Sequence, residues 1–92
     1  MNPSANPSPS VLLDRLRARI RTKHYSIRTE QAYADWVRRF LAFHADVPVD
    51  RLAEAEISSF LTHLAVRGKV AASTQNQALN ALLLLYRVVL ET

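Results

Sequence analysis

The chain has 92 residues, of which 49% are apolar and none is cysteine, so we expect one folded domain without a disulfide framework or a thiolate metal site. Its net charge of +4, from 12 Lys and Arg against 8 Asp and Glu, favours a polyanionic partner. No apolar run reaches the roughly 20 residues that a membrane-spanning helix needs, which argues against a membrane protein.

Only one glycine is present and β-branched residues are few, which favours an all-helical fold. Residues 1–9 are rich in Pro, Ser and Asn, a composition typical of a flexible leader. The folded domain is expected to cover residues 10–92. Its first helix is predicted to begin with Ser10 as N-cap and to end near Thr22. Apolar residues at helical spacing predict its buried stripe: Leu12, Leu13, Leu16 and Ile20.

The second helix is predicted to start after Ser26, whose hydroxyl can accept a hydrogen bond from the backbone N–H of Thr29. Pro48 closes this segment. Its core side is predicted to carry Tyr33, Trp36, Val37, Phe40, Leu41 and His44. A third helix is predicted from Glu54 to Val66, with Gly68 as its C-terminal cap. Its apolar stripe consists of Ile57, Phe60, Leu61, Leu64 and Ala65.

The last helix is predicted to start near Ser73 and to reach Leu90. Its core side is expected to carry Leu79, Leu82, Leu83, Tyr86 and Leu90. Leu84, Leu85 and Val88 exceed what one stripe can bury, so we expect them to contact another domain or protomer. Four helices of this length with short links predict an all-α, compact antiparallel four-helix bundle.

Two helix starts carry residues suited to nucleic acid. Lys23 and Arg28 flank the Ser26 cap, in a segment (Arg15 to Arg28) that has six basic residues and no acid. Free N–H groups at a helix start suit a phosphate oxygen, although simple capping is an alternative interpretation. The last helix opens with Ser73 and Thr74, followed by amides that can bond base edges: Gln75, Gln77 and Asn80. Trp36 is expected to pack in the core rather than to stack on a base.

The segment Lys23-His24-Tyr25-Ser26-Ile27-Arg28-Thr29-Glu30-Gln31-Ala32-Tyr33 resembles integron integrases, a branch of the tyrosine recombinases (phage integrase family). Blocks at 60–66 and 71–87 continue the resemblance in the same order. It implies a SAM-like core-binding domain that forms half of a clamp around recombination-site DNA. Ala45-Asp46-Val47-Pro48 departs from the family, because integron integrases often carry a basic Arg-His-Pro segment there.

These arguments predict a DNA-binding set: Lys23, His24, Tyr25, Ser26, Arg28, Thr29, Arg39, Ser73, Thr74, Gln75, Gln77, Asn80 and Arg87. The resemblance implies duplex or folded single-stranded recombination-site DNA as partner, and other protomers in a tetramer on the DNA. The catalytic domain of the family, with its tyrosine nucleophile, is expected to lie outside this chain. These residues would then hold no catalytic, metal or cofactor site, and alone would be a cytoplasmic monomer. A helical protein-interaction module, which would dock a partner on the apolar face of the last helix, and a stand-alone DNA-binding regulator remain as alternatives.

Overall fold

The structure, a computed structural model, describes residues 8–89, and the side chains of Asp50, Val88 and Val89 lie outside that description. Between residues 8 and 89 it contains no strand and these helices: α1 (Pro9–Thr22), α2 (Ile27–Phe43), the short 3-10 helix η1 (Val49–Arg51), α3 (Glu54–Val66) and α4 (Ala72–Val89). The all-α, four-helix class predicted from the sequence is therefore confirmed.

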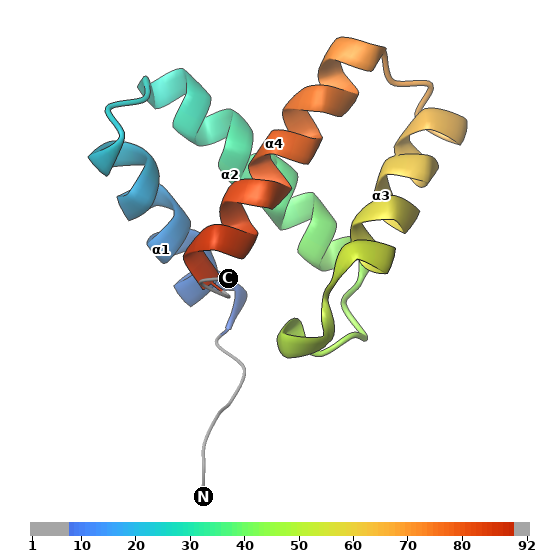
Figure 1. The fold of residues 1–92 in the computed structure, drawn as a ribbon, viewed down its shortest axis with the longest axis horizontal. Coiled ribbons are helices and arrows are strands. Elements are labelled where there is room, and N and C mark those ends of the chain that lie inside the picture. The colour runs from blue at the N-terminus through green and yellow to red at the C-terminus, as the bar shows by residue number, and fades with distance from the viewer. Residues whose placement is uncertain (1–7, 90–92) are drawn as a thin grey trace, which may run out of the picture.

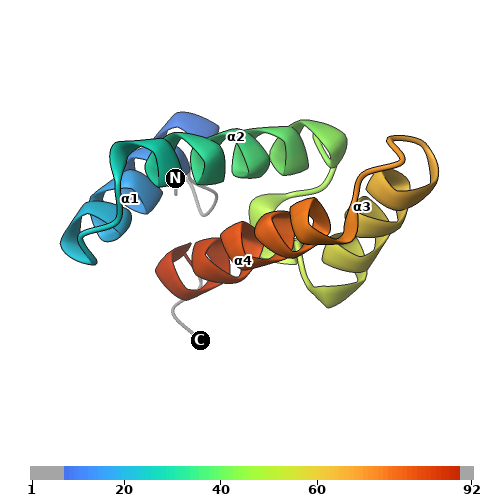
Figure 2. The same ribbon diagram turned by 90° about the horizontal axis from the view of Figure 1, so that it is seen from above.

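The helices α2 and α4 form the centre of the molecule and cross each other (Figure 1). Seen from above, they lie in two layers, with α1 at one end and α3 at the other (Figure 2). The helix α4 contacts all three of the others, whereas α1 contacts only α2 and α4 among the described elements. A central helix of this kind needs more than one buried face.

The first helix begins two residues earlier than expected, because Ser8 rather than Ser10 caps it. The Ser8 hydroxyl accepts a hydrogen bond from the backbone N–H of Val11 at 3.3 Å, and Pro9 is the first helical residue. Proline suits that position, because it lacks the N–H that would have no helical partner there. The predicted leader therefore overlaps α1 at Pro9, and its residues 1–7 lie outside the described residues.

The starts of α2 and α3 agree with the prediction, but the role given to Gly68 was wrong. Ser26 accepts the Thr29 N–H at 3.1 Å, and α3 spans Glu54–Val66 as expected. After α3, the left-handed backbone belongs to Lys69, with φ of 50°, and not to Gly68. A Cβ at residue 68 would lie 3.0 Å from the Leu64 carbonyl oxygen, a tight contact that glycine avoids.

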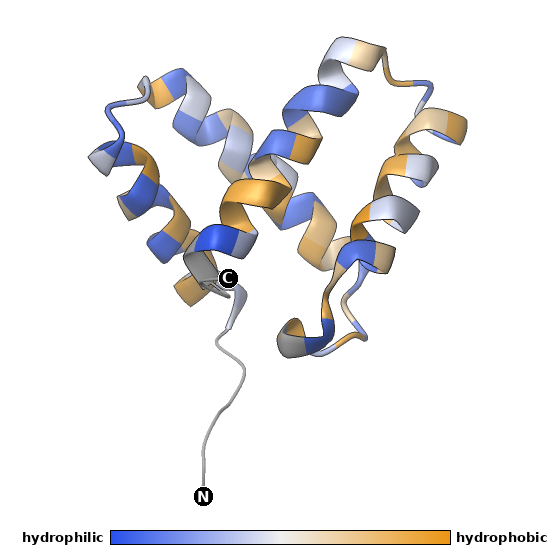
Figure 3. Ribbon diagram, viewed as in Figure 1, coloured by the Kyte–Doolittle hydropathy of each residue, from blue (hydrophilic) through white to orange (hydrophobic). Residues whose placement is uncertain are grey.

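The core combines the predicted stripes of α1, α2 and α3 with a wider face of α4. The expected orientation of α4 was partly wrong: Leu84 and Leu85 are 7% and 4% exposed, whereas Leu83 is 45% exposed. Three helices pack against α4, so Ala78, Ala81, Leu82, Leu84 and Leu85 are all buried. Of the α3 stripe, Ala65 is exposed, and Leu90 of the predicted α4 stripe lies outside the described residues. Figure 3 shows this apolar stretch within α4, followed and preceded by polar residues.

Candidate nucleic-acid interface

The turn between α1 and α2 has a fixed backbone conformation. Two hydrogen bonds close the end of α1, from His24 N–H to the Arg21 carbonyl at 3.0 Å and from Tyr25 N–H to the Ile20 carbonyl at 3.3 Å. His24 between them takes the left-handed conformation, with φ of 62°. This is the Schellman arrangement, in which glycine is the usual residue. His24 therefore has a structural role in the turn, and its predicted phosphate contact stays a prediction.

Glu30 joins α1 to α2 through two arginines of the predicted basic segment. It accepts hydrogen bonds from Arg17 at 2.9 Å and from Arg21 at 3.0 Å through both Nε and Nη2. Its own side chain is only 4% exposed. Hydrogen bonds from Arg21 and then Arg17 lower the pKa of Glu30, so the carboxylate is ionised at neutral pH. Sequence reasoning missed this cluster, because it counted the charges along α1 and ignored the acid on the next helix.

This ion-pair cluster reduces the positive charge that the predicted basic segment can offer to a ligand. Arg17 and Arg21 share one carboxylate, so two of the six positive charges between Arg15 and Arg28 are partly neutralised within the fold. The same contact fixes the end of α1 against the start of α2, where Lys23 and Tyr25 emerge. Lys23 and Arg28 are exposed, and neither pairs with an acid among the described side chains.

A groove of about 220 Å³ lies between the α1–α2 turn and α4, and we call it the α2–α4 groove. It brings together residues that are up to 64 positions apart in the chain: Lys23, Tyr25, Tyr33, Asn80, Leu83, Leu84 and Arg87. Four of these belong to the predicted DNA-binding set, namely Lys23, Tyr25, Asn80 and Arg87. The two parts of that set, from the turn and from the last helix, therefore meet at one surface.

Two aromatic rings form part of the α2–α4 groove. The rings of Tyr25 and Tyr33 meet edge to face, with centroids 6.1 Å apart. Burial, and to a smaller extent Tyr25, raises the pKa of Tyr33. Burial and Glu56 raise the pKa of Tyr86 to about 12. Both hydroxyls are therefore protonated at neutral pH, and the Tyr86 hydroxyl is buried without a hydrogen-bond partner among the described residues.

Trp36 of α2 contacts two residues of the predicted DNA-binding set, Arg39 on α2 and Gln77 on α4. It is 7% exposed and packs in the core as expected, and its indole N–H donates to Oε1 of Gln77 at 3.0 Å. The guanidinium of Arg39 lies over the same ring, 4.5 Å from its centroid. Gln77 and Arg39, both in the predicted DNA-binding set, are therefore held in place by a buried aromatic side chain.

The start of α4 agrees with the prediction, but its amides do not share one surface. The helix begins at Ala72, close to the expected start near Ser73, so Ser73 and Thr74 lie in its first turn. Gln75 lies apart from Gln77, in an open groove against α3 that also contains Ile57, Leu61 and Ala65. Its Oε1 atom is buried without a hydrogen-bond partner among the described residues. Two residues along a helix differ by about 200° in direction, so Gln75 cannot share the surface of Gln77.

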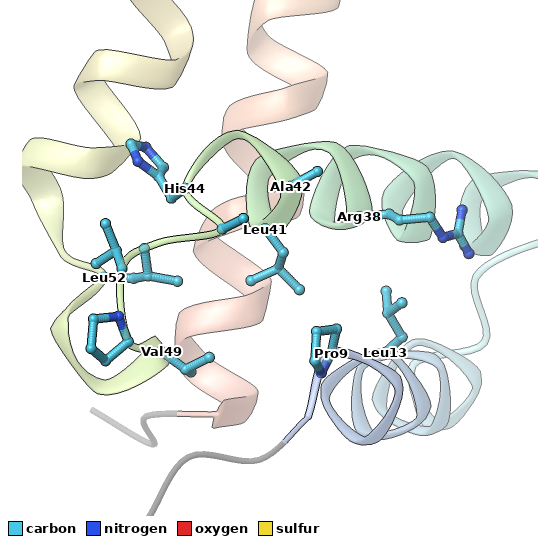
Figure 4. Close-up of a pocket in the computed structure, with 11 residues that line it drawn as sticks. Pro9, Leu13, Arg38, Leu41, Ala42, His44, Val49 and Leu52 are labelled. Carbon is cyan, nitrogen blue, oxygen red and sulfur yellow. The ribbon is translucent and has the colours of Figure 1, made fainter.

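Two of the three residues predicted to contact another protomer are buried within this domain. Leu84 and Leu85 belong to the core of this domain, so their expected surplus exposure was wrong. The side chain of Val88 lies outside the described residues. The same burial removes most of the apolar α4 face on which the protein-interaction alternative rested. An apolar groove of about 440 Å³ does exist elsewhere, between the start of α1, the end of α2 and the linker around Val49 (Figure 4).

Residues 8–89 contain no group of three or more His, Cys, Asp or Glu side chains arranged to hold a metal ion. No helix in this part of the chain combines the length and the apolar character needed to cross a membrane.

Comparison with known proteins gives a family. Residues 12–92 match the phage integrase N-terminal SAM-like domain. The chain belongs to that family. It is also 52% identical, over 81 residues, to proteins described as "Integrase/recombinase" from Escherichia coli and from Pseudomonas aeruginosa. These 81 residues are 88% of this chain and 24% of each relative, so the chain spans about a quarter of their length.

Membership of the phage integrase family confirms the broader part of the resemblance seen in the sequence, namely a tyrosine-recombinase N-terminal domain with a SAM-like fold. The narrower likeness to integron integrases stays a prediction, as does the DNA-binding role of each residue. The fold adds Tyr33 to the candidate interface, and it adds Glu30 and Trp36 as buried residues that support it. Only the helical spacing of Tyr33 and Trp36 was visible in the sequence.

Proposed function

We propose that this domain is the DNA-binding, core-binding part of a site-specific recombinase of the integron-integrase kind. In this proposal it clamps one side of the recombination-site DNA and carries no chemical step itself. The relatives described as integrase/recombinase and the matched family support a role in recombination. The observation that carries the proposal is the α2–α4 groove, which is lined by the cations Lys23 and Arg87 together with the amide of Asn80.

Each group at this surface suits one kind of contact with DNA. The exposed cations Lys23, Arg28 and Arg87 suit phosphate oxygens, which supply most of the sequence-independent affinity. The N-terminal end of α2, with Ser26 as its cap, adds N–H dipoles near the same cations. The amides of Gln77 and Asn80 suit base edges in the major groove. The combination fits duplex DNA, or a hairpin folded from a single strand, better than a small molecule.

The proposal is tested by titrating the 92-residue chain into fluorescently labelled duplex DNA of a recombination site and following the anisotropy. We expect weak binding at low salt, with a Kd on the order of micromolar or weaker, because half of the clamp is missing. The affinity should fall steeply as salt is added. A hairpin probe should show whether a folded single strand is preferred. The absence of binding to either probe at low salt would contradict the proposal and would favour a protein partner.

A further inference from the structure

The hydrogen bond between Trp36 and Gln77 determines which end of the Gln77 amide faces the protein. Trp36 lies on α2 and Gln77 on α4, and the indole nitrogen is 3.0 Å from Oε1. An indole N–H can only donate a hydrogen bond. The amide oxygen, and not the amide nitrogen, must therefore face the indole. Gln77 itself is exposed, so its NH2 group is the end available to a ligand.

The Trp36 ring has little freedom to turn away from this contact. The ring is 7% exposed, and the Phe60 ring packs edge to face against it with centroids 6.5 Å apart. Arg39 lies over its face at 4.5 Å. A ring held by packing and by a cation keeps its N–H pointing in one direction. The orientation of the Gln77 amide is therefore set by the core before any ligand binds.

We propose that Trp36 is a positioning residue that makes Gln77 a hydrogen-bond donor to base edges. A glutamine that reads adenine with both ends of its amide needs its oxygen to accept from adenine N6. In this domain the oxygen faces the indole of Trp36, so the NH2 group is the end of the amide that is left to face a base. It suits the acceptors of the major groove, which are N7 of purines, O6 of guanine and O4 of thymine. It disfavours cytosine, whose major-groove edge offers an N4 donor. This inference rests on the proposed function.

The test is a selection of bound sequences from a library of duplexes with a randomised central stretch. The 92-residue chain would be compared with Gln77→Ala, Gln77→Glu and Trp36→Phe, each checked for folding by circular dichroism. For the unmodified chain we expect one position where cytosine is depleted by about five-fold or more, the range that one base contact supplies. Gln77→Ala should remove that depletion.

The two other variants test the orientation itself. A carboxylate at residue 77 can still accept the indole N–H but offers no donor, so Gln77→Glu should shift the position toward cytosine. Trp36→Phe keeps an aromatic ring and frees the amide oxygen, so adenine should gain over guanine at that position. If Trp36→Phe does not fold, the base preference of Gln77→Glu is the test. Gln77 is exposed, so we expect this variant to fold.

The outcomes separate this inference from the function on which it rests. Failure of every variant and of the unmodified chain to retain any duplex would overturn the DNA-binding function, and this inference with it. If Gln77→Ala binds DNA with the same base preferences as the unmodified chain, this inference is wrong, whereas the DNA-binding function stands. A preference of the unmodified chain for adenine over guanine that disappears in Gln77→Ala would also contradict it, because the amide oxygen would then be reading the base.

Discussion

Arg21 on α1 and Glu30 on α2 are joined by two parallel hydrogen bonds of 3.0 Å, Nε to Oε1 and Nη2 to Oε2. This fork-like contact fixes the geometry of the pair more strictly than a single bond would. It holds the junction of the two helices from which Lys23 and Tyr25 reach the α2–α4 groove. The ion pair is thus a structural support of the candidate interface and not a part of its surface.

Replacing Glu30 by glutamine should destabilise the fold, because Arg17 and Arg21 would lose their shared carboxylate and a buried neutral amide would meet two guanidinium groups. The matched control is Asp35→Asn on the same helix. Asp35 pairs with Arg38, but both side chains are largely exposed, and such pairs contribute little. Thermal unfolding should show a clear drop in Tm for Glu30→Gln and almost none for Asp35→Asn. Equal Tm values for the two variants would count against the structural role of Glu30.

The contribution of Glu30 should depend on pH in a stated direction. The arginines lower its pKa in the folded state below the ordinary value of 4.5. A group with a lowered folded-state pKa stabilises above its unfolded-state pKa, and this contribution is lost as the pH falls through the folded-state pKa. The Tm difference between the unmodified chain and Glu30→Gln should therefore be full at neutral pH and shrink below pH 4.5. A difference independent of pH would contradict this assignment.

Leu84 should behave as a core residue and Leu83 as a surface residue. Leu84→Ala should lower the free energy of unfolding by about 2–5 kcal/mol, the range typical of leucines truncated in a packed core. Leu83→Ala, one position away and 45% exposed, should cost about 1 kcal/mol or less. Urea unfolding monitored by circular dichroism measures both. A surface role for Leu84 in protomer contact would require the opposite order.

His24→Gly should stabilise the domain, because glycine takes the left-handed conformation at this turn without the steric cost that a Cβ imposes. Part of that gain is offset by the greater freedom of glycine in the unfolded chain, which leaves about 0.5–1 kcal/mol. His24→Ala, which keeps a Cβ, is the control and should show no such gain. DNA binding by the same two variants then reports on the predicted phosphate contact. If His24→Gly is less stable than His24→Ala, the left-handed strain is not the controlling factor.

Local signals were enough to predict much of this fold. Ser26 followed by Thr29 predicted the start of α2, and the spacing of Leu12, Leu16 and Ile20 predicted the buried side of α1. The four consecutive leucines at 82–85 gave no such information, because an unbroken apolar run has no polar side to orient it. The number of helices packed on α4 decided which of them are buried. That number is a property of the tertiary fold.

The candidate site was likewise predictable from local sequence only in part. The residue types of the turn and of α4 predicted two clusters of polar and basic side chains, and the fold places part of each at the α2–α4 groove. The hydrogen bond from Trp36 to Gln77 joins positions 41 residues apart, and no local pattern could reveal it. Gln75 and Gln77 looked equivalent in the sequence, yet one turns toward α3 and the other toward α2.

The central claim is that the α2–α4 groove contacts the DNA backbone, and the salt dependence of binding tests it most directly. The slope of log K against log salt concentration would be measured for the unmodified chain, for Lys23→Ala and Arg87→Ala, and for Arg51→Ala in η1 as a control outside the groove. We predict that each groove variant weakens binding and reduces the slope by about 1, as expected for one lost phosphate contact, while Arg51→Ala leaves it unchanged. Slopes for Lys23→Ala and Arg87→Ala equal to that of the unmodified chain would contradict the account.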